Sequence, residues 1–335
     1  TDVAMAIGPR YPMKKVDVII VGAGMAGLTA AGRLEELGLT TVVLDKGRAP
    51  GGRMATRTID SARFDHGAQH FSVRSPQFRE QTAHWMRIGV VNEWFRAASL
   101  TVADRRIEAR HIGAGGMRSI PEHLAASLRV ETSTTIDRID LAPAGVAAVA
   151  TSGEVWNAAG VVLTPPVPQT QLLLGRGNVE LSSSVEEMLD TVVYDPCLAV
   201  MAHLDTAAGL PDGHLTPRRG PIAWMADNQH KGISASPAVT IHSSPEYAIA
   251  RLDADSATWV AEMTDAAQSH LAGSIIHATG HRWRYSRPVQ TFDVGAVAAG
   301  PGVPVVLGGE VFAGARVEGA FLSGLAAADQ LWGVL

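Results

Sequence analysis

The chain has 335 residues, of which 46% are apolar and 18% charged, and its formal net charge is −5 at pH 7. This length predicts about two domains with a substantial core, and the composition excludes a disordered or coiled-coil chain. Basic and acidic residues are interspersed, so nucleic acid is not an expected partner. The single cysteine, Cys197, excludes an internal disulfide and a cysteine-rich metal site.

Nothing in the sequence predicts a membrane partner. The longest uncharged run, residues 155–175, contains three prolines and several side-chain amides, which a membrane-spanning helix would not tolerate. The first twelve residues lack the apolar core of a signal peptide. We therefore expect a cytoplasmic protein.

The first eighty residues contain the pattern of a dinucleotide-binding turn. A short apolar strand is predicted over residues 16–21, an amphipathic helix over 25–38 and a second strand over 41–44. In a GxGxxG motif, successive glycines permit the turn, the backbone approach to a pyrophosphate and close packing of helix on strand. The glycines of this motif are Gly22, Gly24 and Gly27.

Two further features favour a bound dinucleotide over a glycine turn without a ligand. Asp45 lies 23 residues after Gly22, close to the position of an acid that holds a ribose diol. A second glycine pair, Gly51 and Gly52, is followed at once by Arg53. Such a turn suits a pyrophosphate held from two sides, although an exposed turn with solvated arginines is the alternative.

With the segment FDHGAQHF at residues 64–71, these motifs resemble the flavin-dependent amine-oxidase superfamily and, within it, the renalase-like bacterial flavoproteins. The resemblance implies noncovalently bound FAD, with residues 67–71 running beside the isoalloxazine ring. It also implies an α/β fold, in which an FAD-binding Rossmann-like domain of the glutathione-reductase/p-hydroxybenzoate-hydroxylase type carries an inserted α+β substrate domain. His66 and His70 lack a third ligand nearby in the sequence, so no metal site is predicted.

The middle of the chain predicts a mixed second domain. Residues 76–96 have an amphipathic helical pattern and predict one or two helices, whose aromatic residues favour the core. Residues 134–164 predict an antiparallel ribbon that returns to a buried strand at 160–163. The remaining predicted elements are a helix at 119–128, strands at 192–204 and 238–243, and helices at 245–252 and 256–271.

Three stretches of this second domain, residues 222–231, 240–247 and 281–285, also look renalase-like. Aromatic faces can stack on a planar substrate and arginines can bind phosphate. For Trp224 and His242 a structural role in the core is the open alternative. The candidate substrate-pocket residues are His70, Trp224, His242, Trp283 and Arg284.

The C-terminal segment predicts the closing part of the cofactor site. A strand at 303–307 ends in Gly308, Gly309 and Glu310, and a helix is predicted over 320–331. In the family an acidic residue here, more often aspartate, holds the ribityl or phosphate end. The following helix points its N-terminus at the flavin, where its dipole stabilises negative charge. The implied cofactor-binding residues are Gly22, Gly24, Met25, Ala26, Gly27, Asp45, Lys46, Gly52, Arg53, Met54, Gly67, Ala68, Gln69, His70, Gly309, Glu310, Glu318, Gly319 and Ala320.

These elements predict a discontinuous FAD-binding domain made of residues 14–72, 108–170 and 290–335, with residues 73–107 and 171–289 forming the substrate domain. No Ser/His/Asp or Cys/His constellation stands out, so no catalytic side chain is predicted and flavin N5 is the expected hydride acceptor. A dihydropyridine donor needs neither acid nor base for that transfer.

The renalase-like resemblance implies an FAD-dependent oxidase whose substrates are isomeric 2- or 6-dihydroNAD(P). Oxidation would give NAD(P)+, and reoxidation by O2 would give H2O2. One alternative is a flavin amine oxidase or dehydrogenase of the same fold that acts on another small donor. A second is a flavin-binding protein without turnover.

Overall fold

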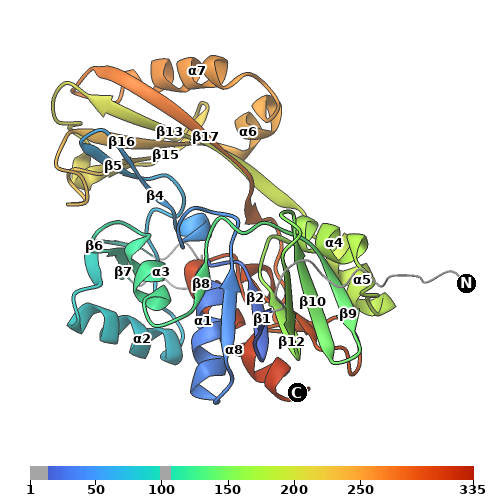
Figure 1. Cartoon of the computed structure of the whole chain (residues 1–335). Helices are drawn as coiled ribbons and strands as arrows, with labels where there is room; N and C mark the ends of the chain where they lie inside the picture. Colours follow the sequence, from blue (N-terminus) through green and yellow to red (C-terminus); the bar gives the residue numbers. More distant parts are fainter. Residues whose placement is uncertain (1–13, 99–106) are drawn as a thin grey trace, which may run out of the picture.

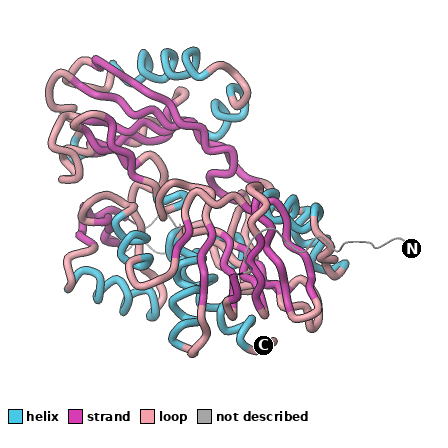
Figure 2. Tube along the Cα trace, in the orientation of Figure 1, coloured by secondary structure: helices cyan, strands magenta, loops and turns pink. Residues whose placement is uncertain are grey.

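The computed structural model describes residues 14–98 and 107–335. In Figure 1 a six-stranded sheet with its helices lies below a five-stranded sheet with helices of its own, and the hairpin β4–β5 reaches from the lower part toward the upper. Figure 2 shows the same arrangement by secondary structure, with strands running through both parts. We call these two parts the lower and upper lobes.

The sheet of the lower lobe is parallel except at its edge. Its order is β18-β19-β12-β2-β3-β8, and only β18 runs antiparallel to its neighbour. All residues of β2, β3 and β12 are buried, as expected for strands covered on both faces. The strands are β2 (Val18–Val21), β3 (Thr41–Leu44), β8 (Val130–Glu131), β12 (Gly160–Leu163), β18 (Val297–Ala298) and β19 (Val305–Leu307). Both ends of the chain therefore build one sheet, which confirms the predicted Rossmann-like α/β class.

Helices cover one face of this sheet and a β-ribbon covers the other. On the first face α1 (Met25–Glu36) and α8 (Val317–Trp332) lie side by side and bury Leu34 and Leu331. A Cβ at Gly324 would lie 2.4 Å from the Ala26 carbonyl oxygen, so only glycine permits this approach. The opposite face carries β9 (Ile136–Ala142), β10 (Gly145–Ala150), β11 (Val155–Ala158), β1 (Lys14–Lys15), α4 (Val167–Arg176) and α5 (Ser183–Asp190).

The upper lobe is an antiparallel sheet of order β14-β15-β16-β13-β17, with two helices packed on it. A Cβ at Gly280 would lie 2.1 Å from the Trp259 ring, so this glycine lets the indole lie directly on the strand. The elements are β13 (Tyr194–Leu204), β14 (His214–Leu215), β15 (Ile222–Asp227), β16 (Ala238–Ser243), β17 (Ile275–Pro288), α6 (Pro245–Arg251) and α7 (Ser256–Gln268).

Two hairpins and two helices complete the lower lobe, from which the first hairpin reaches toward the upper one. They are β4 (Thr56–Ile59) with β5 (Ala62–Asp65), β6 (Val91–Ala98) with β7 (Ile107–Gly113), α2 (Pro76–Arg87) and α3 (Ser119–Ala125). Short 3-10 turns are η1 (Gly52–Met54), η2 (Pro211–Gly213) and η3 (Glu310–Phe312). In the described part of the chain, no helix combines the length and apolarity that crossing a bilayer requires.

One predicted element is wrong. The helical pattern of residues 76–96 holds only for α2, which ends at Arg87, and residues 91–96 belong to strand β6. Gly89 adopts a φ of +76°, and the Val90 N–H donates to the Trp85 carbonyl, a geometry that closes a helix. The strand that follows pairs with β7. The apolar spacing continues past Gly89, but the backbone there cannot remain helical.

A candidate dinucleotide-binding cavity

A cavity of about 1500 Å³ lies between the lobes. It is larger than the ~300–1,000 Å³ of ordinary small-molecule pockets, so it can hold a dinucleotide with space for a second ligand. The ends of β2 and β3 form one side, and β17 of the upper lobe forms another. The main lining segments are residues 21–26, 44–58, 66–69, 134–136, 164–176, 281–288 and 310–320, with gaps.

The first glycine turn joins β2 to α1 at the cavity. Gly22 has a φ of +108°, which favours glycine. A Cβ at Gly27 would lie 1.9 Å from the Gly22 carbonyl oxygen, whereas a Cβ at Gly24 would meet nothing within 4 Å. Gly27 therefore serves helix packing, and Gly24 leaves open space in front of the α1 N-terminus, where an anion is favoured. Gly22, Gly24, Met25 and Ala26 line the cavity, but Gly27 does not.

Asp45 lies at the carboxyl end of β3, next to this turn. Its Oδ2 accepts a 2.6 Å hydrogen bond from the Ala23 N–H, and its Oδ1 accepts one of 2.6 Å from the Gly47 N–H. Lys46, also in the lining, donates to Gln169 Oε1 at 3.0 Å. The carboxylate is thus held at the cavity wall, where it can accept hydrogen bonds from a ribose diol.

The second glycine turn packs against the first. The Gly51 N–H donates to the Ala23 carbonyl at 2.8 Å, and a Cβ at Gly52 would lie 3.4 Å from Gly24 Cα. Gly51 and Gly52 have φ values of +140° and +52°. The sequence places these turns 29 residues apart, and the structure brings them to one end of the cavity.

Arg53 and Glu310 form a bidentate ion pair across the cavity wall. Glu310 lies in η3, after β19, and Arg53 lies in η1 beside the second glycine turn. Both residues line the cavity, as does Met54. The pair therefore joins the N-terminal and C-terminal parts of the site.

The C-terminal element contributes fewer lining residues than the sequence predicts. Ala320 borders the cavity, whereas Gly309, Glu318 and Gly319 do not. The Glu318 carboxylate instead accepts hydrogen bonds from the backbone N–H groups of Arg74 and Ser75, at 3.1 and 2.5 Å. The α8 helix also begins at Val317, three residues before its predicted start.

The loop of residues 66–69 forms the cavity wall nearest the upper lobe, and its His66 carbonyl accepts two hydrogen bonds. Trp283 Nε1 donates at 2.7 Å, and His242 Nε2 lies 3.1 Å away and donates when it carries the proton. The His66 ring lies 4.8 Å from the His281 ring and 5.4 Å from that of Trp283. Gln69 Nε2 donates to the Gly67 carbonyl at 3.0 Å. These contacts tie the loop to β16 and β17.

The imidazoles along this wall are neutral at physiological pH. Burial, followed by the nearby His281, lowers the pKa of His66 to about 3. Burial likewise lowers the pKa of His242 to about 4, and burial with the nearby Arg57 lowers that of His281. The wall therefore offers hydrogen-bonding groups without positive charge on its imidazoles.

Trp283 and Arg284 are neighbours on β17 and so point to opposite faces of the sheet. The Trp283 indole lies toward His66, whereas the Arg284 guanidinium lies 2.8 Å from Asp253, beyond α6. Both residues border the cavity, but the side-chain geometry favours Trp283 for ligand contact.

His70 and Trp224 are brought together away from the cavity lining. Their rings lie 5.4 Å apart in an aromatic cluster with Trp94, Phe95 and His214, in which Phe95 stacks on His214 at 4.1 Å. Burial, followed by the nearby Lys231, lowers the pKa of His70 to about 3. This environment favours a structural role for both side chains.

Cys197 lies away from the cavity, and the described histidines form no metal-binding group with other side chains. Burial raises the pKa of the Cys197 thiol to about 12, and the residue is not in the cavity lining. Within the described ranges, no three His, Cys, Asp or Glu side chains are grouped to hold a metal ion.

Sequence reasoning missed a buried polar cluster beside the loop, built around Asp65 and Lys231. Asp65 belongs to the FDHGAQHF segment, and Lys231 to one of the family-like stretches. The signal that could have found them is an acid at the end of a short strand, next to an aromatic residue. Its partner, however, lies 166 residues away and follows no local pattern.

Comparison with known proteins gives two family matches. Residues 20–85 match the family of NAD(P)-binding Rossmann-like domains, and residues 92–332 match the family of flavin-containing amine oxidoreductases. The second match covers well over half of the chain.

Each similar curated protein matches this chain over one short segment. They include a hydroxyneurosporene desaturase from Rubrivivax gelatinosus, 41% identical over 63 residues, which is 19% of this chain and 12% of the relative. Protein FLOWERING LOCUS D from Arabidopsis thaliana is 41% identical over 68 residues, which is 20% of this chain and 9% of the relative. A pseudooxynicotine dehydrogenase from Pseudomonas sp. is 30% identical over 79 residues, which is 24% of this chain and 16% of the relative. The matched segments thus span a small part of these relatives.

Solved structures match over nearly the whole chain. A putrescine oxidase with redesigned cofactor binding has a TM-score of 0.70 at 15% identity, covering 96% of this chain and 100% of the other. A protein assigned as a protoporphyrinogen oxidase from Exiguobacterium sp. has a TM-score of 0.69 at 15% identity, covering 95% of this chain and 99% of the other. At this identity the likeness shows a shared fold.

Proposed function

The chain belongs to the family of flavin-containing amine oxidoreductases, and from that premise we propose that it is an FAD-dependent oxidase of isomeric dihydronicotinamide dinucleotides, of the renalase-like kind. FAD is the cofactor that family membership gives this chain. The proposed substrates are 2- and 6-dihydroNAD(P). The proposed acceptor is O2, so that one donor, one O2 and one proton from solvent yield NAD(P)+ and H2O2.

The cavity fits FAD. The open space at Gly24 accepts a pyrophosphate against the α1 N-terminus, and the Gly52 turn closes on it from the other side. In this proposal Asp45 would hold the adenosine ribose, Arg53 and Glu310 would hold the ribityl end, and the dipole of the α8 N-terminus would stabilise negative charge on the flavin. Cys197 lies outside the lining, which argues against a cysteinyl thioether to the flavin, and the proposal takes the FAD as noncovalently bound.

Bound FAD supplies a hydride acceptor at flavin N5. The work left to the protein is to hold the donor carbon near that atom and to exclude water. Trp283 offers an aromatic face beside the His66 loop, and the neutral His242 and His281 offer hydrogen bonds without a charge. None of these groups needs to remove a proton, because a dihydropyridine loses only a hydride.

The net charge of the cavity lining is the observation that supports a dinucleotide substrate. Among the described lining residues only Asp45 and Glu310 are acidic, whereas ten are basic: Lys46, Arg48, Arg53, Arg57, Arg118, Arg176, Arg282, Arg284, Arg287 and Arg316. Four of these arginines pair with carboxylates outside the lining, namely Glu122, Asp137, Asp253 and Asp195. The remaining basic residues still outnumber the two acidic ones, and their excess positive charge is larger than the negative charge of a single FAD pyrophosphate. It favours an anionic dinucleotide over a cationic amine.

Anaerobic mixing of the FAD-loaded protein with candidate donors tests this proposal. We expect 2- or 6-dihydroNAD to bleach the flavin band near ~450 nm rapidly, while a panel of amines leaves it unchanged. The uncharged dihydronicotinamide riboside is the matched control. It should reduce the flavin only at higher concentration, and salt should narrow the difference between the two donors.

Rapid reduction by amines alone would favour the alternative, an amine oxidase or dehydrogenase of the same fold. The names of a putrescine oxidase and a pseudooxynicotine dehydrogenase among the similar proteins support that reading. Bound FAD that no donor reduces would instead favour a flavin-binding protein without turnover.

A further inference from the structure

A fully buried ion pair joins the two lobes beside the cavity. Lys231 Nζ lies 2.7 Å from Asp65 Oδ2, and neither side chain has any exposed surface. The other side of the ammonium faces the Trp94 ring, 4.9 Å from its centroid. Burying two charges is costly, and an uncharged pair of similar volume is often equally stable. Stability alone therefore does not explain this pair.

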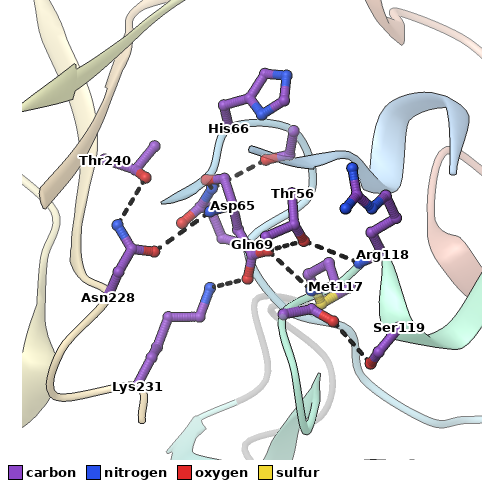
Figure 3. Close-up of polar contacts among 12 residues, drawn as sticks. Thr56, Asp65, His66, Gln69, Met117, Arg118, Ser119, Asn228, Lys231 and Thr240 are labelled. Atoms are coloured by element: carbon purple, nitrogen blue, oxygen red, sulfur yellow. Dashed lines mark hydrogen bonds and ion pairs between the residues drawn. The ribbon is translucent and has the colours of Figure 1, made fainter. Parts of the chain in front are cut away.

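The Asp65 carboxylate is also tied to the lower lobe. Its Oδ1 accepts hydrogen bonds from Thr56 Oγ1 at 2.5 Å and from the Met117 N–H at 2.8 Å (Figure 3). Gly116, with a φ of +99°, lets the backbone come this close, because a Cβ there would lie 2.9 Å from the same oxygen. Asp65 is thus fixed on one side by β4 and the turn after β7, and on the other by Lys231.

Lys231 is presented by a hydrogen-bonded turn of the upper lobe. Its N–H donates to the Asp227 carbonyl at 2.9 Å, at the end of β15. In the same turn Asn228 Nδ2 donates to Thr240 Oγ1 at 3.0 Å, and Asn228 Oδ1 accepts from the Asp65 N–H at 3.4 Å (Figure 3). These hydrogen bonds hold the backbone that carries Lys231, so a shift of the lobes relative to one another would strain the ion pair.

The cavity loop of residues 66–69 follows Asp65 directly and is held at both ends by hydrogen bonds. Gln69 Nε2 donates to the Asp65 carbonyl at 2.5 Å, and the Ala68 N–H donates to the Arg53 carbonyl at 2.8 Å. A Cβ at Gly67 would lie 2.0 Å from that same Arg53 oxygen. A displacement of Asp65 would consequently move the loop and, with it, the second glycine turn.

We propose that Lys231 and Asp65 are positioning residues, whose ion pair sets the place of loop 66–69 on the cavity wall and, through Arg53, that of the second glycine turn at the FAD site. The inference rests on the FAD-binding part of the proposed function and is independent of the substrate. It gives the buried pair a task that an uncharged pair of equal stability would not perform.

The test separates position from stability with the variants Lys231→Met, Asp65→Asn and the two combined. Each single change leaves a buried charge without its partner and should lower the Tm of the apo-protein by about 10 °C. The combined variant buries no charge, so its Tm should recover most of the decrease caused by each single change. We nevertheless expect it to bind FAD about tenfold more weakly, measured by quenching of flavin fluorescence. Deuterium exchange at residues 66–69 should also remain faster than in the wild type.

The matched control is the exposed Arg33–Asp329 pair between α1 and α8, at 2.9 Å. The combined Arg33→Met/Asp329→Asn variant should change neither the FAD affinity nor the deuterium exchange at residues 66–69. A Lys231→Met/Asp65→Asn protein with restored Tm, wild-type FAD affinity and wild-type exchange would overturn the proposal, and so would failure of that protein to fold. Because no electron donor is used, these outcomes leave the substrate proposal untouched. An unreactive dihydronicotinamide would equally leave this inference standing.

Discussion

Burial decides the protonation of the histidines along the cavity wall. His66 and His242 have pKa values of about 3 and 4, with desolvation as the largest cause, and both belong to the hydrogen-bonded contact between loop 66–69 and the upper lobe. An unfolded histidine titrates near ~6.5. Between these values the unfolded chain binds more protons than the native chain, so acid favours unfolding.

This sign predicts how the free energy of unfolding depends on pH. Above pH ~6.5 the neutral state of each buried histidine costs no stability. As the pH falls from ~6.5 toward the native pKa, the free energy of unfolding decreases, by about 2 kcal/mol for each histidine at pH 5. Urea denaturation at pH 7.5 and 5.0 measures the loss. The loss should be smaller in His66→Gln than in the wild type, and unchanged in a variant of the exposed His84. Equal losses in all three proteins would contradict the prediction.

At the scale of elements, two glycines of the first turn have different roles, one in ligand binding and the other in helix packing. Gly24 and Gly27 belong to the same motif, yet one faces open space and the other lies against the Gly22 carbonyl. Gly24 also has an ordinary φ of −87°, so a side chain there causes no backbone strain. The two positions should therefore fail in different ways.

Gly24→Ala should leave the Tm of the apo-protein unchanged and weaken FAD binding at least about tenfold, because the new methyl group occupies the space for the pyrophosphate. Gly27→Ala should lower the free energy of unfolding of the apo-protein by about 1–3 kcal/mol, because the Cβ would lie 1.9 Å from backbone. Thermal melts without FAD and flavin-fluorescence titrations separate the two effects. An apo-protein destabilised by Gly24→Ala would refute this division.

At the scale of the whole molecule, the candidate FAD site depends on segments from both ends of the chain. Gly22 and Glu310 line one cavity, and the upper lobe closes it through β17. The discontinuous domain boundaries remain a proposal. Residues 73–107, assigned from the sequence to the substrate domain, include Phe78, whose ring packs 5.2 Å from Phe321 of α8.

A ligand held by both chain ends should stabilise the native state as a whole. FAD at 100 times its Kd should raise the free energy of unfolding by about 2.7 kcal/mol and the Tm by about 5 °C. Thermal melts over a range of FAD concentrations measure this shift. NAD+ at the same concentrations is the control and should shift the Tm less, since the second glycine turn and Glu310 are proposed to serve the FAD. Equal shifts would argue against FAD as the preferred ligand.

Much of the lower lobe was predictable because its signals are local. The strands at 41–44 and 160–163 and the start of α1 have the predicted bounds, since short apolar runs and glycine turns are read within a few residues. The end of α2 was missed because a continuing apolar period concealed the positive φ of Gly89. Which glycines face the cavity was also not readable, because the GxGxxG spacing is the same for binding and for packing.

The sequence by itself determined the class of fold and the dinucleotide motifs, because periodicity and glycine spacing are properties of neighbouring residues. Only the tertiary structure decided which side chains share the cavity wall. It placed Trp283 toward His66 and Arg284 toward Asp253, moved Glu318 to the 74–75 backbone, and joined Lys231 to Asp65. Such pairings depend on strand alternation and on contacts across as many as 244 residues, which no local pattern encodes.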